Sequence, residues 1–387
     1  MKIFLLRRID RYAGITLMSL LKVFYKKNNL PKDPKKILVI KLFGIGNFIF
    51  LSPTLKNLKK IFPGTQIDIL TLDQNRDICR LYKEYIDDIH TLRFSARYII
   101  FDSLRFIFKN HKKYDIVIDF EQFVRLSALL GRMIRPKYLI GSATKNSHKE
   151  NILDANIVYK EDKHIVEEYF DVVKYLAQGY DKKKLIDTDI NIEPPLVQDS
   201  SRIKNIARSM RGHLCIGMCI GGREENKDKR YPHFSKVISK ILDYENNDKN
   251  KKNIMIIFFG SKKESLNVMK ILEQMPDPEK KRCMNLAGSL SLSESCSLMS
   301  RLDLFVSNDT GPIHIAAAYG VYCIGIYGPT PEKIYRPYTK DALILRDAHK
   351  PIIFSYSEKE NRWNPLWWPK PDIVSKEIIR FIKKSVK

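Results

Sequence analysis

Short, continuous apolar runs alternate with helical segments along the chain, and this alternation constrains the fold more than any other feature of the sequence. The first run is Ile-Leu-Val-Ile at residues 37–40. A glycine-containing turn, a segment with helical spacing at 48–62 and a second run at 66–71 follow it. Strands of a parallel sheet are buried on both faces, so they are continuous apolar runs in the sequence. The succession therefore indicates a βαβ unit.

The same pattern returns in the second half of the chain, after a polar connection. Residues 182–201 are rich in Lys and Asp and contain Pro194-Pro195, which is typical of a link between domains. A chain of 387 residues suits two α/β domains of roughly 150–200 residues each. Further strands are expected at residues 114–119, 214–219, 253–259, 302–307 and 322–327, and helices at 126–134 and 315–319. We therefore predict two Rossmann-like α/β domains, each built on a parallel sheet.

These patterns predict five parts of the chain. They are an N-terminal basic amphipathic segment at residues 1–34, a first Rossmann-like domain at 35–190, a linker at 191–201, a second Rossmann-like domain at 202–350 and a C-terminal helical segment at 351–387.

Positive charge is the most unusual feature of the composition. The 68 Lys and Arg residues outnumber the 44 Asp and Glu residues, which gives a net charge of +24. This charge predicts attraction to an anionic partner, whether acidic lipid, a phosphorylated substrate or nucleic acid, and a solvated lysine-rich surface is the alternative. No nucleic-acid-binding module is recognisable, so we expect no nucleic-acid partner.

The N-terminal segment combines apolar residues with many Lys and Arg residues. Its longest uncharged run falls well short of the ~18–20 residues that span a bilayer. The charged residues Arg7, Arg8 and Asp10 interrupt the early apolar run, which argues against a secretory signal. We predict one or two basic amphipathic helices that lie at an anionic membrane surface, with packing on the body of the protein as the alternative.

The six cysteines form no CxxC pair and no cluster with histidine at zinc spacing. We therefore expect no metal site and no disulfide framework, and a reducing compartment. Together with the amphipathic segment, this predicts a cytoplasmic protein, peripheral on the inner face of the cell membrane.

The strongest local signal is the sequence Ser-Asn-Asp-Thr-Gly-Pro-Ile-His at residues 307–314, between an expected strand and an expected helix. Asp309 or Thr310 can cap the helix, and Pro312 stands where a missing N–H is harmless. Free N–H groups beside Gly311 can bind a phosphate, at the strand end where open sheets place their ligands. A plain helix cap with a tight turn is the alternative.

Residues 308–318, together with Gly-Ile-Tyr-Gly-Pro-Thr at 325–330, closely resemble the signature of glycosyltransferase family 9, the ADP-heptose:lipopolysaccharide heptosyltransferases. Three further segments match in order. They are residues 37–58 with Pro53, Lys-Arg-Tyr-Pro at 229–232, and Asn-Leu-Ala-Gly at 285–288. The resemblance covers residues 36–345, and the spaced set is far more specific than any single segment.

The resemblance implies the GT-B fold, in which two Rossmann-like domains face each other across a cleft. It also implies an enzyme that transfers a sugar, with heptose expected, from a nucleotide diphosphate donor to a lipopolysaccharide core or a related cell-surface glycan. The donor would bind mainly to the C-terminal domain and the acceptor to the N-terminal domain, and no cofactor or metal is implied. The residues carried over are Thr310 and Gly311 for the donor phosphates, Asp309 and His314 lining the site, Lys229 for the diphosphate, Glu264 for the ribose, and Gly44 and Gly46 in the opening loop.

One position departs from the family pattern. The family's opening loop often ends in Gly-Asp, whose carboxylate is the general base, whereas this chain has Gly46-Asn47. An amide can position the acceptor hydroxyl but cannot take its proton. Asp119 and Glu121, at the carboxyl end of an expected strand, are the candidate replacements. A helix-capping role is the alternative for Asp119. With such a base, we predict an inverting displacement at the anomeric carbon.

Two competing interpretations have some support in the sequence. The two glycines Gly44 and Gly46 suggest a nicotinamide-dependent oxidoreductase, but Ile49 stands where the fingerprint requires its third glycine. Asn47 and the net charge of +24 also fit a catalytically inactive relative or a polyanion-binding protein. Asp-Thr-Asp at 187–189 spells the metal-binding triplet of another glycosyltransferase fold, but it falls in the expected connection, and we interpret it as coincidence.

Overall fold

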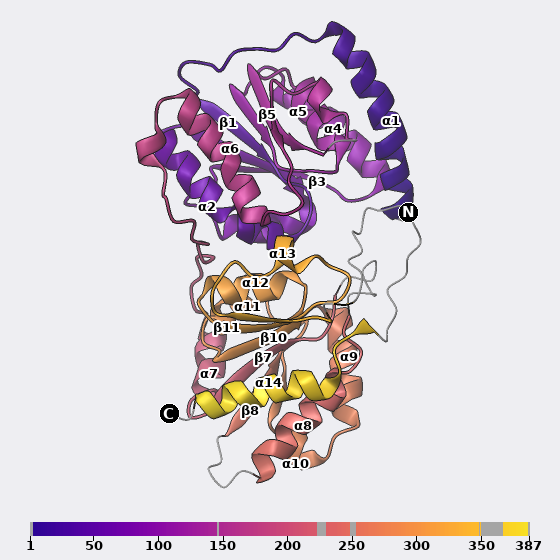
Figure 1. Cartoon of the computed structure of the whole chain (residues 1–387), viewed down its shortest axis with the longest axis vertical. Helices are drawn as coiled ribbons and strands as arrows, with labels where there is room; N and C mark the ends of the chain where they lie inside the picture. Colours follow the sequence, from indigo (N-terminus) through magenta and orange to yellow (C-terminus); the bar gives the residue numbers. More distant parts are fainter. Residues whose placement is uncertain are drawn as a thin grey trace. The chain divides into compact units, whose positions relative to one another are not determined.

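The structure, a computed structural model, describes residues 3–144, 147–222, 230–247, 253–347, 349 and 367–385 (Figure 1). The chain divides into two compact units, Met1–Glu193 and Pro194–Lys387. The division falls inside the segment 191–201 that was predicted as a linker.

The first unit is a six-stranded parallel sheet with the strand order β3-β2-β1-β4-β5-β6. Figure 1 shows α2 and α6 on one face of this sheet and α4 and α5 on the other. The strands are β1 (Lys36–Ile40), β2 (Gln66–Leu72), β3 (Asp88–Leu92), β4 (Ile116–Asp119), β5 (Tyr138–Ala143) and β6 (Ala155–Val158). The helices are α1 (Ile3–Phe24), α2 (Ile45–Ile61), α3 (Arg76–Arg80), α4 (Ala96–Asn110), α5 (Arg125–Met133) and α6 (Ile165–Gly179).

The second unit repeats this topology, with the order β12-β11-β10-β7-β8-β9, and all the strand pairs among its described residues are parallel. The strands are β7 (Leu214–Cys219), β8 (Ile254–Phe258), β9 (Cys283–Asn285), β10 (Leu304–Asn308), β11 (Tyr322–Ile326) and β12 (Ala342–Leu345). The helices are α7 (Ser201–Ser209), α8 (Phe234–Asn247), α9 (Lys262–Glu273), α10 (Asp277–Lys280), α11 (Leu292–Met299), α12 (Gly311–Ala318), α13 (Glu332–Tyr335) and α14 (Pro371–Lys384). The prediction of two Rossmann-like domains is therefore confirmed.

Each sheet has one point where the chain reverses the direction in which it adds strands. In the first unit this point lies between β1 and β4, and in the second between β7 and β10. Ligands of open α/β sheets bind at the carboxyl ends of the strands beside such a switch point. The two switch points are therefore the places where functional side chains are expected to gather.

The N-terminal segment forms a single helix, α1, that packs on α5 of its own unit. Gly14 and Met18 lie in this contact, and a Cβ atom on Gly14 would lie 2.9 Å from Arg125 Cβ. Asp10 accepts hydrogen bonds from the backbone N–H groups of Arg125 and Leu126, so it caps the start of α5. Packing on the body of the protein, the alternative left open by the sequence, thus accounts for one face of α1. Among the described residues, no helix combines the length and apolar character needed to cross a bilayer.

The C-terminal segment contains α14, which packs on α8 and belongs to the core of the second unit. Trp368 is buried against Gly328 and Tyr231, and Val374 and Ile378 are fully buried. Residues 351–366 of this segment lie outside the described part of the chain.

Candidate active site

Asn308, the last residue of β10, joins the chain segments that meet at the switch point of the second unit. Its side-chain oxygen accepts a hydrogen bond from the Tyr231 backbone N–H at 2.8 Å, and its Nδ2 donates to the Gly221 carbonyl at 3.0 Å. Asn308 is fully buried, so both bonds are shielded from water. The amide side chain therefore fixes the loop after β7 and the segment before α8 against the end of β10.

Thr310 stands immediately before Gly311, the first residue of α12. Its hydroxyl lies 2.9 Å from that of Ser307, and the Ser307 hydroxyl lies 3.2 Å from the Cys219 carbonyl to which it donates. Pro312 occupies the first turn, where its missing N–H costs nothing. The positive end of α12 thus lies at the carboxyl end of β10, an arrangement suited to binding a phosphate.

Arg230 lies beside this helix start and was not singled out from the sequence. Its guanidinium donates to the Gly222 carbonyl through Nη2 at 2.6 Å and through Nε at 3.2 Å. A Cβ atom on Gly222 would lie 3.7 Å from the Arg230 side chain and 3.8 Å from Thr310 Cγ2, so the two side chains flank one glycine. Arg230 belongs to the Lys-Arg-Tyr-Pro motif at 229–232, directly after Lys229, the residue that the resemblance implies for the diphosphate. Lys229, like the loop residues 223–226, lies outside the described residues.

Asp309 and His314 also come together at this edge. Asp309 Oδ1 lies 3.8 Å from His314 Nε2, and the His314 side chain is buried. The predicted residues 309, 310, 311 and 314 thus all lie around the start of α12. Their contacts with a donor stay a prediction.

Glu264 lies at the start of α9, where its carboxylate accepts a hydrogen bond from the Ser261 backbone N–H at 2.5 Å in a capping box. The same carboxylate lies against Gly221, since a Cβ atom there would be 2.1 Å from Glu264 Oε1. Glu264 therefore lies next to the loop that follows β7 and also has a structural role as a cap. Its binding of a ribose stays a prediction.

Glu121 holds the corresponding turn at the switch point of the first unit. Its Oε1 accepts hydrogen bonds from the backbone N–H groups of Leu42 at 2.7 Å and Phe43 at 3.0 Å. Lys41 Nζ lies 3.1 Å from the same oxygen, and both side chains are buried. Burial is the largest single effect and opposes the charged form of Lys41, but Glu121 and Tyr169 together outweigh it and raise the pKa of Lys41 above its ordinary value.

Asp119, the last residue of β4, forms a second buried ion pair beside the first. Its Oδ2 lies 2.7 Å from Lys149 Nζ and accepts a hydrogen bond from the Ser127 hydroxyl at 3.0 Å. Its Oδ1 accepts from the Glu121 backbone N–H at 3.0 Å. Burial raises the pKa of Asp119 above its ordinary value, and the Lys149 ammonium opposes that shift. The backbone N–H groups at the start of α5 are capped by Asp10, not by Asp119.

These contacts favour Glu121 over Asp119 as the candidate general base. Asp119 is 0% exposed and both of its oxygens are occupied, whereas Glu121 is 4% exposed. Among the described residues, no hydrogen bond uses Oε2 of Glu121. The catalytic role of either residue stays a prediction.

Asn47 and the two glycines shape the opening loop. Gly44 has a φ of +89°, a left-handed conformation that favours glycine, and it precedes the first residue of α2. Gly46 and Asn47 lie in the first turn of α2, and Asn47 Nδ2 donates to the Phe43 carbonyl at 2.9 Å. Asn47 thus fixes the same turn that Glu121 holds from the other side.

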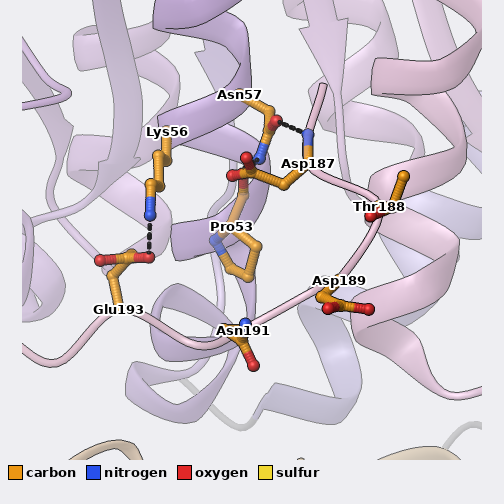
Figure 2. Close-up of a pocket in the computed structure, with 8 residues that line it drawn as sticks. All are labelled: Pro53, Lys56, Asn57, Asp187, Thr188, Asp189, Asn191 and Glu193. Carbon is orange, nitrogen blue, oxygen red and sulfur yellow. Dashed lines mark hydrogen bonds and ion pairs between the residues drawn. The ribbon is translucent and has the colours of Figure 1, made fainter. Parts of the chain in front are cut away.

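The Asp187-Thr188-Asp189 triplet lines a polar pocket between α2 and the end of the first unit (Figure 2). Asp187 pairs with Lys60 at 2.5 Å, and its backbone N–H donates to Asn57 Oδ1 at 2.8 Å. The hydrogen bond from Lys60 lowers the pKa of Asp187. These contacts fasten the connecting segment to α2, which gives Asp187 a structural role.

Within the described residues, one cluster brings three potential metal ligands together, namely Asp68, Asp88 and His90. It lies on β2 and β3, away from the carboxyl ends of the strands, and Lys36 Nζ is already 3.1 Å from Asp68. Burial acts to raise the pKa of Asp68, but hydrogen bonds, that of His90 foremost, outweigh it and lower the pKa to about 2. The Lys36 ammonium therefore already balances the charge of the Asp68 carboxylate.

Comparison with known proteins identifies the family of the chain. A sequence model described as "Glycosyltransferase family 9 (heptosyltransferase)" matches residues 109–363. The lipooligosaccharide heptosyltransferase 2 of Haemophilus ducreyi is 25% identical over 334 residues, which cover 80% of this chain and 88% of that protein. The crystal structure of a family 9 glycosyltransferase from Veillonella parvula superimposes with a TM-score of 0.72 and 21% identity, covering 92% of this chain and all of that one. The Escherichia coli ADP-heptose lipopolysaccharide heptosyltransferase II gives a TM-score of 0.64 and 20% identity, with 91% and 100% covered. This chain therefore belongs to glycosyltransferase family 9 and is a glycosyltransferase with the GT-B fold.

Proposed function

We propose that the protein transfers heptose from ADP-heptose to a lipopolysaccharide core or a related cell-surface glycan, with inversion at the anomeric carbon. The observation that carries this proposal is the switch point of the second unit, where Thr310, Gly311 and Arg230 surround the positive end of α12. The names of the relatives from Haemophilus ducreyi and Escherichia coli support heptose, ADP and a lipopolysaccharide-type acceptor.

In the proposed reaction, the oxygen of an acceptor hydroxyl attacks the anomeric carbon as the bond from that carbon to the diphosphate oxygen breaks. Glu121 takes the hydroxyl proton, and the nucleoside diphosphate leaves with the bonding electron pair. The start of α12 and the cationic side chains Arg230 and Lys229 stabilise the negative charge on the diphosphate. These groups can neutralise the leaving group, so the proposed step includes no metal and no cofactor besides the donor.

The first test concerns the donor loop. Replacing Thr310 and Lys229 together by alanine should raise the Kd of ADP by roughly tenfold or more, because a hydroxyl and a charge-assisted contact are lost. Calorimetry with ADP, UDP, GDP and NAD measures both the affinity and the base preference. Ser209→Ala, which removes an exposed hydroxyl at the end of α7, is the matched control.

An unchanged ADP affinity in the double variant would contradict the proposal that Thr310 and Lys229 bind the donor. Binding of NAD alone would point to the oxidoreductase interpretation. Nucleotide binding without any sugar transfer would favour the inactive relative, which the Asn47 amide also suggests.

A second part of the proposal is that the protein works on the inner face of the cell membrane, attached to anionic lipid. Vesicles that contain phosphatidylglycerol should retain the full-length protein, and added salt should release part of it because salt screens the attraction. The exposed residues Tyr12, Leu20 and Val23 of α1 are candidates for this contact. Replacing these three by glutamine tests α1 without removing Asp10 and Met18, which support α5. Equal retention of this variant would show that α1 is not the anchor.

A further inference from the structure

Helix α4 has an apolar face that points away from its own unit. The helix buries Ile99, Ser103, Phe106 and Asn110, which are spaced so that they share one side. The opposite side is also apolar, although it faces solvent. Its residues are Ile100, Phe101, Leu104 and Phe108, which are 65%, 59%, 48% and 83% exposed.

Such a face is unusual for a surface helix. Single exposed apolar residues are common, but a helix on the surface normally carries polar residues opposite its buried side. Here Phe101, Leu104 and Phe108 follow one another at spacings of three and four, so they form a continuous stripe. A contiguous apolar stripe of this kind marks a surface that binds something apolar.

The rim of the stripe is positively charged. Arg97, Arg105 and Lys109 are exposed on the same helix. Its one acidic residue, Asp102, is paired with Arg93, with a distance of 2.7 Å between the guanidinium Nη2 and the carboxylate. The face therefore presents an apolar centre with unbalanced positive charge around it.

We propose that α4 lies in the interface of an anionic membrane, with Phe101, Leu104 and Phe108 inserted among the lipid chains and Arg97, Arg105 and Lys109 at the lipid phosphates. Charge decides between this occupant and a second copy of the chain. Pairing two α4 faces would bring like charges together, whereas anionic headgroups complement them. The inference extends the membrane contact of the proposed function to a helix that the sequence analysis did not single out.

The position of α4 in the fold agrees with this role. Both α4 and α1 contact α5, so two helices with exposed apolar residues belong to the same part of the first unit (Figure 1). In this arrangement α4 supplies the apolar insertion.

The test uses the full chain and compares flotation with vesicles of phosphatidylcholine, with and without phosphatidylglycerol. The variant Phe101→Gln/Leu104→Gln/Phe108→Gln should lower partitioning onto the anionic vesicles by about tenfold or more. The matched control replaces three exposed apolar residues of the second unit by glutamine, namely Leu266, Met269 and Ile373, and should bind like the wild type. A third variant, Arg97→Gln/Arg105→Gln/Lys109→Gln, should lose most of the salt dependence.

Three results would overturn the inference. The first is that the α4 variant partitions onto vesicles like the wild type, and the second is that the unaltered protein does not bind vesicles. The third is that the wild type self-associates, and that the α4 variant loses this association but still binds vesicles. The affinity for ADP, measured on the same proteins, separates this test from the proposed function. The α4 variant should keep that affinity, and a wild type that binds vesicles but no nucleotide would contradict the proposed function alone.

Discussion

Replacing Lys149 by methionine is expected to destabilise the first unit by about 3–5 kcal/mol, because it leaves a buried carboxylate without its partner. Lys149 and Asp119 are both 0% exposed, and their charged atoms are 2.7 Å apart. Lys149 Nζ also donates to the carbonyls of Glu121 and Ser142, so its loss leaves further buried acceptors unpaired. Chemical denaturation with a probe in the first unit measures the change.

The loss should depend on pH in a defined direction. The pKa of Asp119 is already raised by burial, and Lys149 is what opposes that shift. Without Lys149 the folded-state pKa rises further above the unfolded-state value, so the native state binds a proton that the unfolded state releases. The stability of the variant should therefore increase as the pH falls through the raised folded-state pKa towards the ordinary value of 3.8. The destabilisation should be largest at the alkaline end.

Two further variants separate the buried charge from other effects. Lys149→Met/Asp119→Asn removes both charges and should recover part of the lost stability. It should also abolish the pH dependence that the single variant shows, because asparagine does not titrate. Lys137→Met removes the exposed partner of Asp115, since Lys137 is 70% exposed. The Asp115 carboxylate is buried but keeps its hydrogen bonds from the backbone N–H groups of Lys35 and Lys36, so the change should cost about 1 kcal/mol or less. A Lys149→Met protein that is as stable as the wild type at alkaline pH would contradict the prediction. It would mean that groups other than Lys149 stabilise the charged Asp119 carboxylate.

The strands predicted from the sequence share one property, which also explains four of the five described strands that were missed, namely the edge strands β3, β6, β9 and β12. The fifth, β5, is buried between β4 and β6, and this property does not explain why it was missed. β1, β7 and β10 are central strands with nearly unbroken apolar sequences. β3 contains Asp, His and Thr in Asp-Ile-His-Thr-Leu, and β9 is only Cys-Met-Asn; both are edge strands. An edge strand is only partly buried, so its sequence carries less of the apolar signal.

The local parts of the candidate site could be predicted, but its long-range pairs could not. The start of α12 depends on consecutive residues 307–314, and the turn chemistry of Thr310, Gly311 and Pro312 identifies it. The partners of Glu121 and Asp119 are residues far away in the chain, Lys41 and Lys149, which only the sheet brings together. No pattern along the sequence encodes such pairing, so both carboxylates were candidates for the base without their lysines.

The exchange Glu121→Gln is expected to lower kcat by roughly 100-fold or more and to leave the affinity for ADP unchanged. Glutamine keeps an oxygen that can accept from the backbone N–H groups of Leu42 and Phe43, but it cannot take the acceptor proton. The assay follows ADP release from ADP-heptose with a truncated lipopolysaccharide core as acceptor. Asp119→Asn is the matched amide exchange at the fully buried carboxylate, and its folded fraction should keep most of its turnover.

Glu121 also pairs with buried Lys41, so Glu121→Gln has a second effect that must be separated from the first. The single variant leaves the Lys41 ammonium without its carboxylate and should lose stability, whereas Lys41→Met/Glu121→Gln removes both charges and should recover much of it. If Glu121 is the base, turnover stays low in the recovered protein, since proton transfer is still missing. Turnover that returns with stability would mean that Glu121 only holds the turn at Leu42.

A rise in activity confined to Asn47→Asp, with both amide variants unaffected, would locate the missing carboxylate at position 47. In that case the chain is better described as a relative that has lost its base.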